Sequence, residues 1–306
     1  TDVNPIGVLL IINDMTERKH LETQLLQSQK LEAIGRLAAG VAHEINTPMQ
    51  YVGDNAEFLK DGFHDLLKLF AAYRRLFEAA RRGPVPDELV AEIEETIEDS
   101  DVDYLAKEIP LALEQSLEGI TRVSEIIRAM KEFSRLAGED KVAVDINEAI
   151  NNTIVVARNE WKYVADLVTD LDPDLPKVPC LVGEFNQVML NLLVNAAHAI
   201  GDVVGDGSRG KGTITVSTRR CEGGVEVRVA DTGTGIAEAI RSKVFDPFFT
   251  TKAVGKGTGQ GLAIAHSVIV EKHGGTITFE TEEGRGTTFI VRLPLIAAGA
   301  GEAKPT

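Results

Sequence analysis

The sequence predicts an α+β protein in which a long antiparallel helical hairpin precedes an α/β sandwich, with helices on one face of a mostly antiparallel sheet. Two observations indicate the hairpin. Apolar residues recur at spacings of three and four over two long segments, and the Gly-Pro-Val-Pro sequence of residues 83–86 breaks the chain between them. The sandwich is indicated by a change of pattern after Val142, where short β-branched runs alternate with helices and glycine-rich loops.

Length and charge bound the class of protein. A chain of 306 residues is expected to hold two or more domains, and 43% hydrophobic residues are enough to form packed cores. The net charge of −15 argues against a nucleic acid or an anionic membrane surface as the main partner. We find no run of roughly 18 uncharged apolar residues, so we expect no membrane segment in this chain and a cytoplasmic location. Cys180 and Cys221 are too few for a disulfide framework or a zinc site.

The N-terminal half reads as a short strand followed by helices. Residues 1–16 resemble one apolar strand with a polar exit, and a helix is expected from Glu17. A short acidic helix at 87–98 and a break at 99–101 precede a second long helix from about Asp103 to Arg135, with Pro110 near its start. An apolar stripe exposed on one hairpin would be unstable, so two hairpins are expected to pair into a four-helix dimer. The stripe of the first helix comprises Leu21, Leu25, Leu31, Ile34, Ala38, Val41, Ile45 and Met49.

The C-terminal half reads as helices between hairpins. Helices are expected at 146–158, 184–200 and 261–273, and strands at 167–171, 178–181, 213–219, 225–230, 276–280 and 287–292. The residues from Ala297 are rich in Gly, Ala, Lys and Pro, which is typical of a disordered tail. The expected domains are therefore 1–16, 17–140, 141–295 and a tail at 296–306, with an extended distal bundle at about 61–105 within the second.

Three tracts carry residues suited to nucleotide chemistry. Alternating glycines at 255–261 directly precede an apolar helix, so their backbone amides and the helix N-terminus favour a phosphate; a flexible linker is the alternative. Asp231 follows a strand and precedes Gly233 and Gly235, which suits an adenine amino group or an ordinary β-turn. Asn191, Asn195 and His198 share one face of an apolar helix, which fits either a hard cation with phosphate oxygens or a buried polar network. The P-loop-like residues 205–212 lack the required Ser/Thr and the strand-loop-helix order, so we do not expect a nucleotide there.

Taken together, these tracts resemble the GHKL (Bergerat) ATP-binding fold of sensor histidine kinases. Residues 191–195 are similar to its N box, 231–235, 257–262 and 284–289 to its glycine boxes, and 244–252 to its F box. The resemblance implies that ATP and Mg²⁺ bind here, with Asn195 at the metal and Asn191 as a second candidate ligand. His198 stands where many relatives carry Lys or Arg. The implied ATP-binding residues are Asn191, Asn195, His198, Asp231, Gly233, Gly235, Ile236, Phe248, Thr251, Lys252, Lys256, Gly257, Thr258, Gly259, Gly261, Leu262 and Thr287.

The upstream helix completes the resemblance. Residues 41–48 (VAHEINTP) are similar to the H box of a dimerisation and histidine phosphotransfer domain, and residues 1–16 resemble the last strand and exit motif of a truncated PAS sensor domain. In such a kinase His43 would accept the phosphoryl group, Glu44 would orient or deprotonate it, and Thr47 would serve a phosphatase activity. The group would then pass in trans to an aspartate on the receiver domain of a response regulator. A non-kinase ATPase of the same fold, such as a topoisomerase or mismatch-repair ATPase, would lack the H and F boxes, whereas a pseudokinase scaffold would share them.

Overall fold

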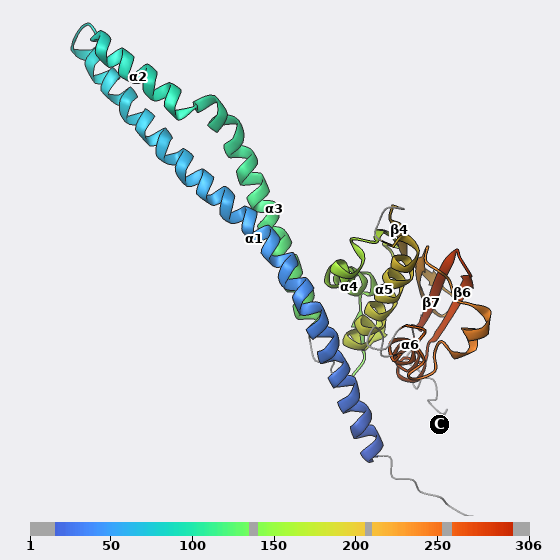
Figure 1. Cartoon of the computed structure of the whole chain (residues 1–306). Helices are drawn as coiled ribbons and strands as arrows, with labels where there is room; N and C mark the ends of the chain where they lie inside the picture. Colours follow the sequence, from blue (N-terminus) through green and yellow to red (C-terminus); the bar gives the residue numbers. More distant parts are fainter. Residues whose placement is uncertain (1–15, 135–139, 206–209, 253–258, 296–306) are drawn as a thin grey trace, which may run out of the picture. The chain divides into compact units, whose positions relative to one another are not determined.

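The computed structural model describes residues 16–134, 140–205, 210–252 and 259–295 (Figure 1). The chain divides into two units, Thr1–Ala39 and Gly40–Thr306. The strand expected at 1–16 and the tail expected at 296–306 lie almost wholly outside the described residues. The same holds for the side chains of the first-helix stripe between Leu21 and Ala38.

The N-terminal half is helical, as the spacing of apolar residues predicts. Helix α1 covers Thr16–Arg82 and continues through Pro48, α2 covers Asp87–Ser100, and α3 covers Val102–Ser134 with Pro110 inside it. Asp101 has a left-handed backbone (φ 38°), so the expected break falls at this single residue between α2 and α3. Figure 1 shows α2 and α3 running back along α1, and a hydrogen bond from Asn55 on α1 to the Ala112 carbonyl on α3 joins the two sides of the hairpin at 3.2 Å.

The C-terminal half contains a five-stranded sheet in the order β2-β4-β5-β7-β6. Only β2 and β4 are parallel within this sheet, and its other neighbours are antiparallel. This confirms the predicted mostly antiparallel sandwich. The strands are β2 Ala165–Leu171, β4 Gly212–Cys221, β5 Gly224–Asp231, β6 Thr276–Glu282 and β7 Gly286–Pro294. A separate antiparallel pair joins β1 Val142–Val144 to β3 Val178–Cys180, and β1 has no counterpart in the sequence-based prediction.

Helices cover one face of the sheet because the strands alternate buried and exposed side chains. Val225, Val227 and Val229 of β5 are buried beneath α5 (Val182–Val204), which contacts β4, β5 and β7. Helix α4 (Ile146–Trp161) packs on α5 and begins where the Asp145 side chain accepts a hydrogen bond from the Glu148 amide at 3.1 Å. Helix α6 (Gly261–His266) continues into the π-helical turn η2 (Ser267–Lys272), and the short helix η1 (Glu238–Lys243) follows β5.

Among the described residues, α5 alone has the length and composition of a helix able to cross a membrane. Polar residues, among them Glu184, Asn191 and Asp202, interrupt its apolar positions, so it is not a continuous run of uncharged apolar residues. More than half of its most apolar window, 56%, is buried inside the domain. Its apolar character is therefore explained by its place in the core of the sandwich.

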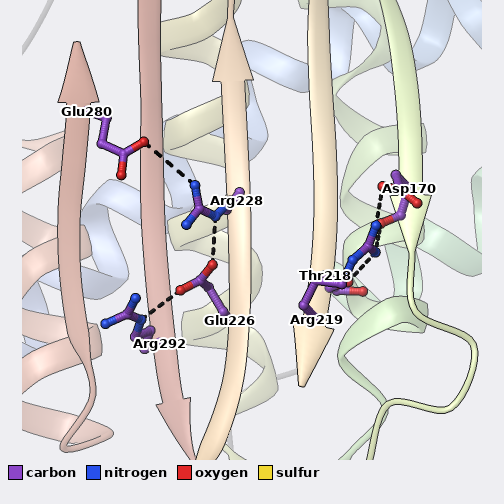
Figure 2. Close-up of polar contacts among 7 residues, drawn as sticks. All are labelled: Asp170, Thr218, Arg219, Glu226, Arg228, Glu280 and Arg292. Carbon is purple, nitrogen blue, oxygen red and sulfur yellow. Dashed lines mark hydrogen bonds and ion pairs between the residues drawn. The ribbon is translucent and has the colours of Figure 1, made fainter. Parts of the chain in front are cut away.

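The opposite face of the sheet carries charged side chains in pairs (Figure 2). Glu226 on β5 accepts hydrogen bonds from Arg228 at 2.6 Å and from Arg292 on β7 at 2.7 Å. The hydrogen bond from Arg228 is the main cause that lowers the pKa of Glu226; burial opposes it, and the hydrogen bond from Arg292 and the charges of both arginines add to the lowering. At the β2 edge of the sheet, Arg219 on β4 pairs with Asp170 on β2. These pairs keep this face polar, which is the alternation expected of a sheet covered on one side.

His273 directly follows η2, and its side chain is buried in the core. It is 1% exposed; its Nε2 accepts a hydrogen bond from the Leu181 amide at 3.0 Å, and its Nδ1 donates to the Val268 carbonyl at 2.8 Å. Burial lowers the pKa of the ring, which therefore stays neutral. Burial also raises the pKa of the neighbouring Cys180 thiol to about 12. Both cysteines are free, as expected from their number.

Candidate functional site

Asp231 lies at the end of β5, where it pairs with Thr287 of β7 in the strand register. Its Oδ1 accepts hydrogen bonds from the Gly233 amide at 2.8 Å and the Thr287 amide at 3.3 Å. Burial raises the pKa of Asp231, and the two backbone hydrogen bonds oppose that rise only in part. The fixed carboxylate therefore has its other oxygen available as an acceptor for a ligand.

A cavity of about 360 Å³ opens beside Asp231. The ends of β6 and β7 form most of its wall. The lining residues are Asp231, Glu280, Thr281, Glu282, Arg285, Gly286, Thr287 and Thr288. Three of these side chains are carboxylates, the half-buried Asp231 and the exposed Glu280 and Glu282. Asp231 is fixed by backbone hydrogen bonds, so it can accept a hydrogen bond from the amino group of a planar ring such as adenine.

The glycines after Asp231 are required by close packing. A Cβ on Gly233 would lie 2.6 Å from the Ala199 backbone of α5. Gly235 has φ +69°, and a Cβ there would collide with the Glu282 carbonyl of β6. The first glycine box therefore lies between α5 and β6, and neither Gly233 nor Gly235 has room for a side chain.

Thr281 of β6 completes this corner, and no sequence motif pointed to it. Its Oγ1 accepts a hydrogen bond from the Ile236 amide at 2.9 Å and donates to the Gly286 carbonyl at 3.0 Å. It also lies 3.0 Å from Oγ1 of Thr287, which is itself 5% exposed. Thr281 thereby ties the first glycine box to the last one. A threonine in a strand gives no signal of such a role in sequence.

The N-box residues lie on the helix face predicted for them. Asn191, Asn195 and His198 of α5 are each half-buried, among neighbours that are mostly buried. Asn191 donates through Nδ2 to the Gly261 carbonyl at 3.0 Å and accepts at Oδ1 from Gln187 at 3.2 Å. This bond fixes the start of α6 against the N box and brings Gly261 and the following Leu262 to the site.

His198 meets the F box. Lys252 Nζ lies 2.6 Å from His198 Nδ1, so the two side chains predicted as phosphate contacts converge. Phe248 has a left-handed backbone (φ +66°) and an exposed side chain, and Thr251 is also exposed. A Cβ on Gly259 would lie 2.5 Å from the Phe248 backbone, which places the F box and the second glycine box in contact. The predicted residues Lys256, Gly257 and Thr258 lie outside the described part of the chain.

The amide oxygens of the N box can hold a hard cation only if the phosphate oxygens of a nucleotide supply further ligands. Within the described ranges, no group of three or more His, Cys, Asp or Glu side chains could hold a metal. The N box offers amide oxygens, which suit Mg²⁺ when phosphate oxygens complete the shell. The residues present thus fit a nucleotide-bound magnesium rather than a permanent metal centre.

The H-box residues lie on α1 with contrasting exposures. His43 is exposed, whereas Glu44 is 8% exposed. Glu44 pairs with Lys162, with Arg158 of α4 at 2.6 Å and with Arg122 of α3 at 3.6 Å. Burial raises the pKa of Glu44, but the hydrogen bonds and charges of Lys162 and Arg158 outweigh it and hold the pKa below its usual range. The exposed Thr47 hydroxyl donates to the His43 carbonyl at 3.0 Å.

These three basic partners of Glu44 were not anticipated. The one signal in the sequence is the four-residue spacing of Arg158 and Lys162, which places both at one side of the end of α4. Nothing in the sequence pairs that side with Glu44, more than a hundred positions earlier.

Comparison with known proteins gives a consistent result. Residues 182–297 match the family described as "Histidine kinase-, DNA gyrase B-, and HSP90-like ATPase". The sensor histidine kinase ZraS of Escherichia coli (strain K12) is 31% identical over 92% of this chain and 50% of its own length. The signal transduction histidine-protein kinase AtoS of the same strain is 28% identical over 96% of this chain and 40% of its own length. The chain thus spans half or less of the length of these relatives.

Two solved structures are similar to parts of this chain. The catalytic domain of histidine kinase ThkA is 32% identical and covers 51% of this chain and 96% of that chain, with a TM-score of 0.44. Histidine kinase ThkA in complex with the response regulator protein TrrA is 21% identical and covers 93% of this chain and 68% of that chain, with a TM-score of 0.41.

Proposed function

We propose that this chain is an ATP-dependent protein histidine kinase. Residues 182–297 match the ATPase family of histidine kinases, DNA gyrase B and HSP90. The chain is also similar to sensor histidine kinases over more than nine tenths of its length. It phosphorylates its own His43 and passes the phosphoryl group to an aspartate of a response regulator. One observation carries the proposal: an exposed histidine followed by a buried glutamate lies in the same chain as the ATP-binding corner at Asp231.

Each part of the nucleotide has residues suited to it. Asp231 would accept a hydrogen bond from the adenine amino group, held in place by the Gly233 and Thr287 amides. The start of α6 at Gly261 would offer backbone amides and a partial positive charge to the phosphates. Lys252 and His198 would add positive charge and a donor there. The resemblance also implies a lid at residues 250–261, of which residues 253–258 lie outside the described part of the chain.

Mg²⁺ would be held by Asn195, with Asn191 nearby, and would neutralise phosphate charge during transfer. Asn191 already bonds to Gly261, so its first role is to position the second glycine box. Asn195, one helical turn later, is the better candidate for a direct ligand.

At His43, a neutral ring nitrogen attacks the γ-phosphorus of ATP. The N–P bond forms while the bond to the bridging oxygen breaks, and ADP leaves with that electron pair. Glu44 would hold or take the proton of the other ring nitrogen. Since Glu44 is paired with Arg158 and Lys162, it must leave these partners before it can face the imidazole.

The partners and boundaries follow the same proposal. Residues 17–140 would form the dimerisation and phosphotransfer hairpin of a homodimer, 141–295 the catalytic domain, and 1–16 the end of a PAS domain. The response regulator would bind in trans, and Thr47 would serve dephosphorylation of that regulator. We propose a cytoplasmic location for the reaction, because ATP is available there.

Incubation with γ-labelled ATP tests the function. The account predicts protein-bound label that is acid-labile and alkali-stable, as a phosphoramidate is, and that is lost on chelating Mg²⁺ or in Asn195→Asp. Acid-stable label would indicate transfer to a hydroxyl residue. Absence of label despite normal ATP binding would support the pseudokinase alternative.

A further inference from the structure

The helix-covered face of the sheet changes from apolar to polar at one end. Residues of β6, β7 and β5 form rows across the three strands, one residue from each strand in register. One such row is apolar and consists of Phe279, Phe289 and Val229. The next row on the same face is polar and consists of Thr281, Thr287 and Asp231. All members of this polar row line the cavity of about 360 Å³, so the change coincides with the candidate nucleotide site.

The hydroxyl group of Thr281 has a fixed direction. Its Oγ1 accepts a hydrogen bond from the Ile236 amide at 2.9 Å and donates to the Gly286 carbonyl at 3.0 Å. A hydroxyl carries one proton and two lone pairs. Because the proton of Thr281 is used at Gly286, Thr281 can only accept from the Thr287 hydroxyl, which lies 3.0 Å away. Thr287 is therefore the donor of this pair.

This donation decides what Thr287 can offer to a ligand. Its one hydroxyl proton is directed to Thr281, so only lone pairs of its oxygen remain. Asp231 also offers an acceptor, because its Oδ1 is held by the Gly233 and Thr287 amides while its other oxygen is available. Asp231 and Thr287 are paired in the strand register. The cavity thus presents two hydrogen-bond acceptors from neighbouring strands.

We propose that Thr281 is a positioning residue that sets the base selectivity of the nucleotide site. By accepting the Thr287 proton, it keeps both members of the Asp231–Thr287 pair as acceptors. An amino group on the base donates to such a pair, whereas a carbonyl oxygen in its place is repelled by it. The inference rests on the proposed function and deepens it, since it concerns how the same site selects adenine. Thr281 acts through Thr287 and not by contact with the base.

A pair of threonines on neighbouring strands has a simpler use, which is to stabilise the sheet. If that were its only use, loss of the pair would weaken the fold and lower the affinity for every nucleotide alike. In the proposal, Thr281→Val removes the acceptor for the Thr287 proton, and the Thr287 hydroxyl can then turn and donate to a carbonyl oxygen. The two uses therefore differ in the ratio of affinities for two bases.

Calorimetric titration of the full chain with ATP and with inosine triphosphate (ITP) tests the inference. The base of ITP carries a carbonyl oxygen where adenine carries its amino group. The unaltered protein should bind ATP at least about tenfold more tightly than ITP, since the carbonyl leaves buried polar groups unpaired. Thr281→Val should lower this ratio at least about threefold, and Thr281→Ser, which keeps the hydroxyl, should retain it. An unchanged ratio in folded Thr281→Val would overturn the inference.

Two further variants test the route through Thr287. Thr278→Val makes the same change on the opposite, exposed face of β6 and should leave both affinities unchanged. Thr287→Val removes the second acceptor itself. When Thr281→Val is added to Thr287→Val, the ratio should not change again, because Thr281 acts through that hydroxyl. A further fall of the ratio in the double variant would contradict the proposal.

The tests also separate failure of this inference from failure of the proposed function. Urea unfolding shows whether each variant is folded, and Thr281→Ala, which removes the same acceptor with a smaller side chain, should give the same ratio as Thr281→Val. Unaltered protein that binds ATP and ITP equally would overturn the role of Thr281 and leave the kinase function standing. Unaltered protein that binds neither nucleotide would contradict the proposed function itself.

Discussion

Lys252 Nζ lies 2.6 Å from His198 Nδ1, which joins the F box to the N-box helix α5. Because a lysine ammonium can only donate, the contact holds His198 with an accepting Nδ1 and its Nε2 proton directed elsewhere. On the proposed function, the pair acts as one phosphate-binding unit rather than as two separate contacts.

This coupling predicts non-additive losses. Lys252→Ala and His198→Ala should each weaken ATP binding about fivefold to tenfold, and the double variant should lose less than the product of the two. Isothermal titration calorimetry measures the dissociation constants. Lys211→Ala, whose side chain pairs with Asp166 on an exposed edge, is the control and should bind ATP normally. Simple additivity would show that the two side chains act independently.

Protonation of Asp231 should weaken ATP binding at low pH, which would appear as an acid limb in a plot of ATP affinity against pH. Burial raises the pKa of its carboxyl, so the group protonates at a higher pH than an exposed aspartate as the solution is acidified. On the proposed function, the protonated form would no longer offer adenine a charged acceptor, and ATP affinity should fall as the pH falls through that raised pKa. Asp231→Asn should bind ATP at least about tenfold more weakly at neutral pH and should lack the acid limb. A limb of the same shape in Asp231→Asn would assign it to another group.

Alanine substitutions at Gly235 and Gly223 distinguish the cost of a steric collision from the cost of a strained backbone. Both have positive φ, at +69° and +74°, but a Cβ on Gly235 would collide with the Glu282 carbonyl whereas Gly223 has open space. Gly223→Ala should cost about 1 kcal/mol of unfolding free energy, the usual strain of a left-handed alanine. Gly235→Ala should cost several times more and should also impair ATP binding. Urea unfolding gives both values, and equal costs would contradict the packing described for the first glycine box.

On the proposed function, the ion pairs of Glu44 should slow autophosphorylation of His43. In Arg158→Ala combined with Lys162→Ala, the pKa of Glu44 should rise and its carboxylate should reach His43 more often. Autophosphorylation should then speed up about threefold to tenfold, because two basic partners that hold the buried Glu44 carboxylate are lost and a tenfold rate change corresponds to about 1.4 kcal/mol. Initial rates with labelled ATP measure this. Arg128→Ala, which removes an exposed pair with Glu148, should leave the rate unchanged. A slower double variant would mean that the basic residues assist the transfer.

Much of this fold is readable from local pattern. The helical stretches of α1 and α3, the break at 83–86 and the alternation in β4, β5 and β7 each arise from neighbouring residues, and the structure contains all of them. The side chains of the first-helix stripe between Leu21 and Ala38 lie outside the described residues. Asp231, Gly235 and Asn191 were foreseeable for the same reason, because their motifs are short and continuous.

The remaining features depend on contacts between distant segments. Thr281 is an ordinary strand residue until β6 lies beside the first glycine box. The pairing of Glu44 with Arg158 joins two helices that nothing in sequence brings together. Strand β1 has three residues and exists only because β3 pairs with it. Such long-range pairs have no periodic signal, so only the folded chain reveals them.

The central claim is that His43 receives the phosphoryl group from ATP. The direct measurement compares acid-labile label in His43→Gln with that in His64→Gln, which alters another exposed histidine three heptads further along the same helix. The account predicts no label in His43→Gln and full label in His64→Gln, with ATP binding retained in both. Label that persists in His43→Gln would contradict it.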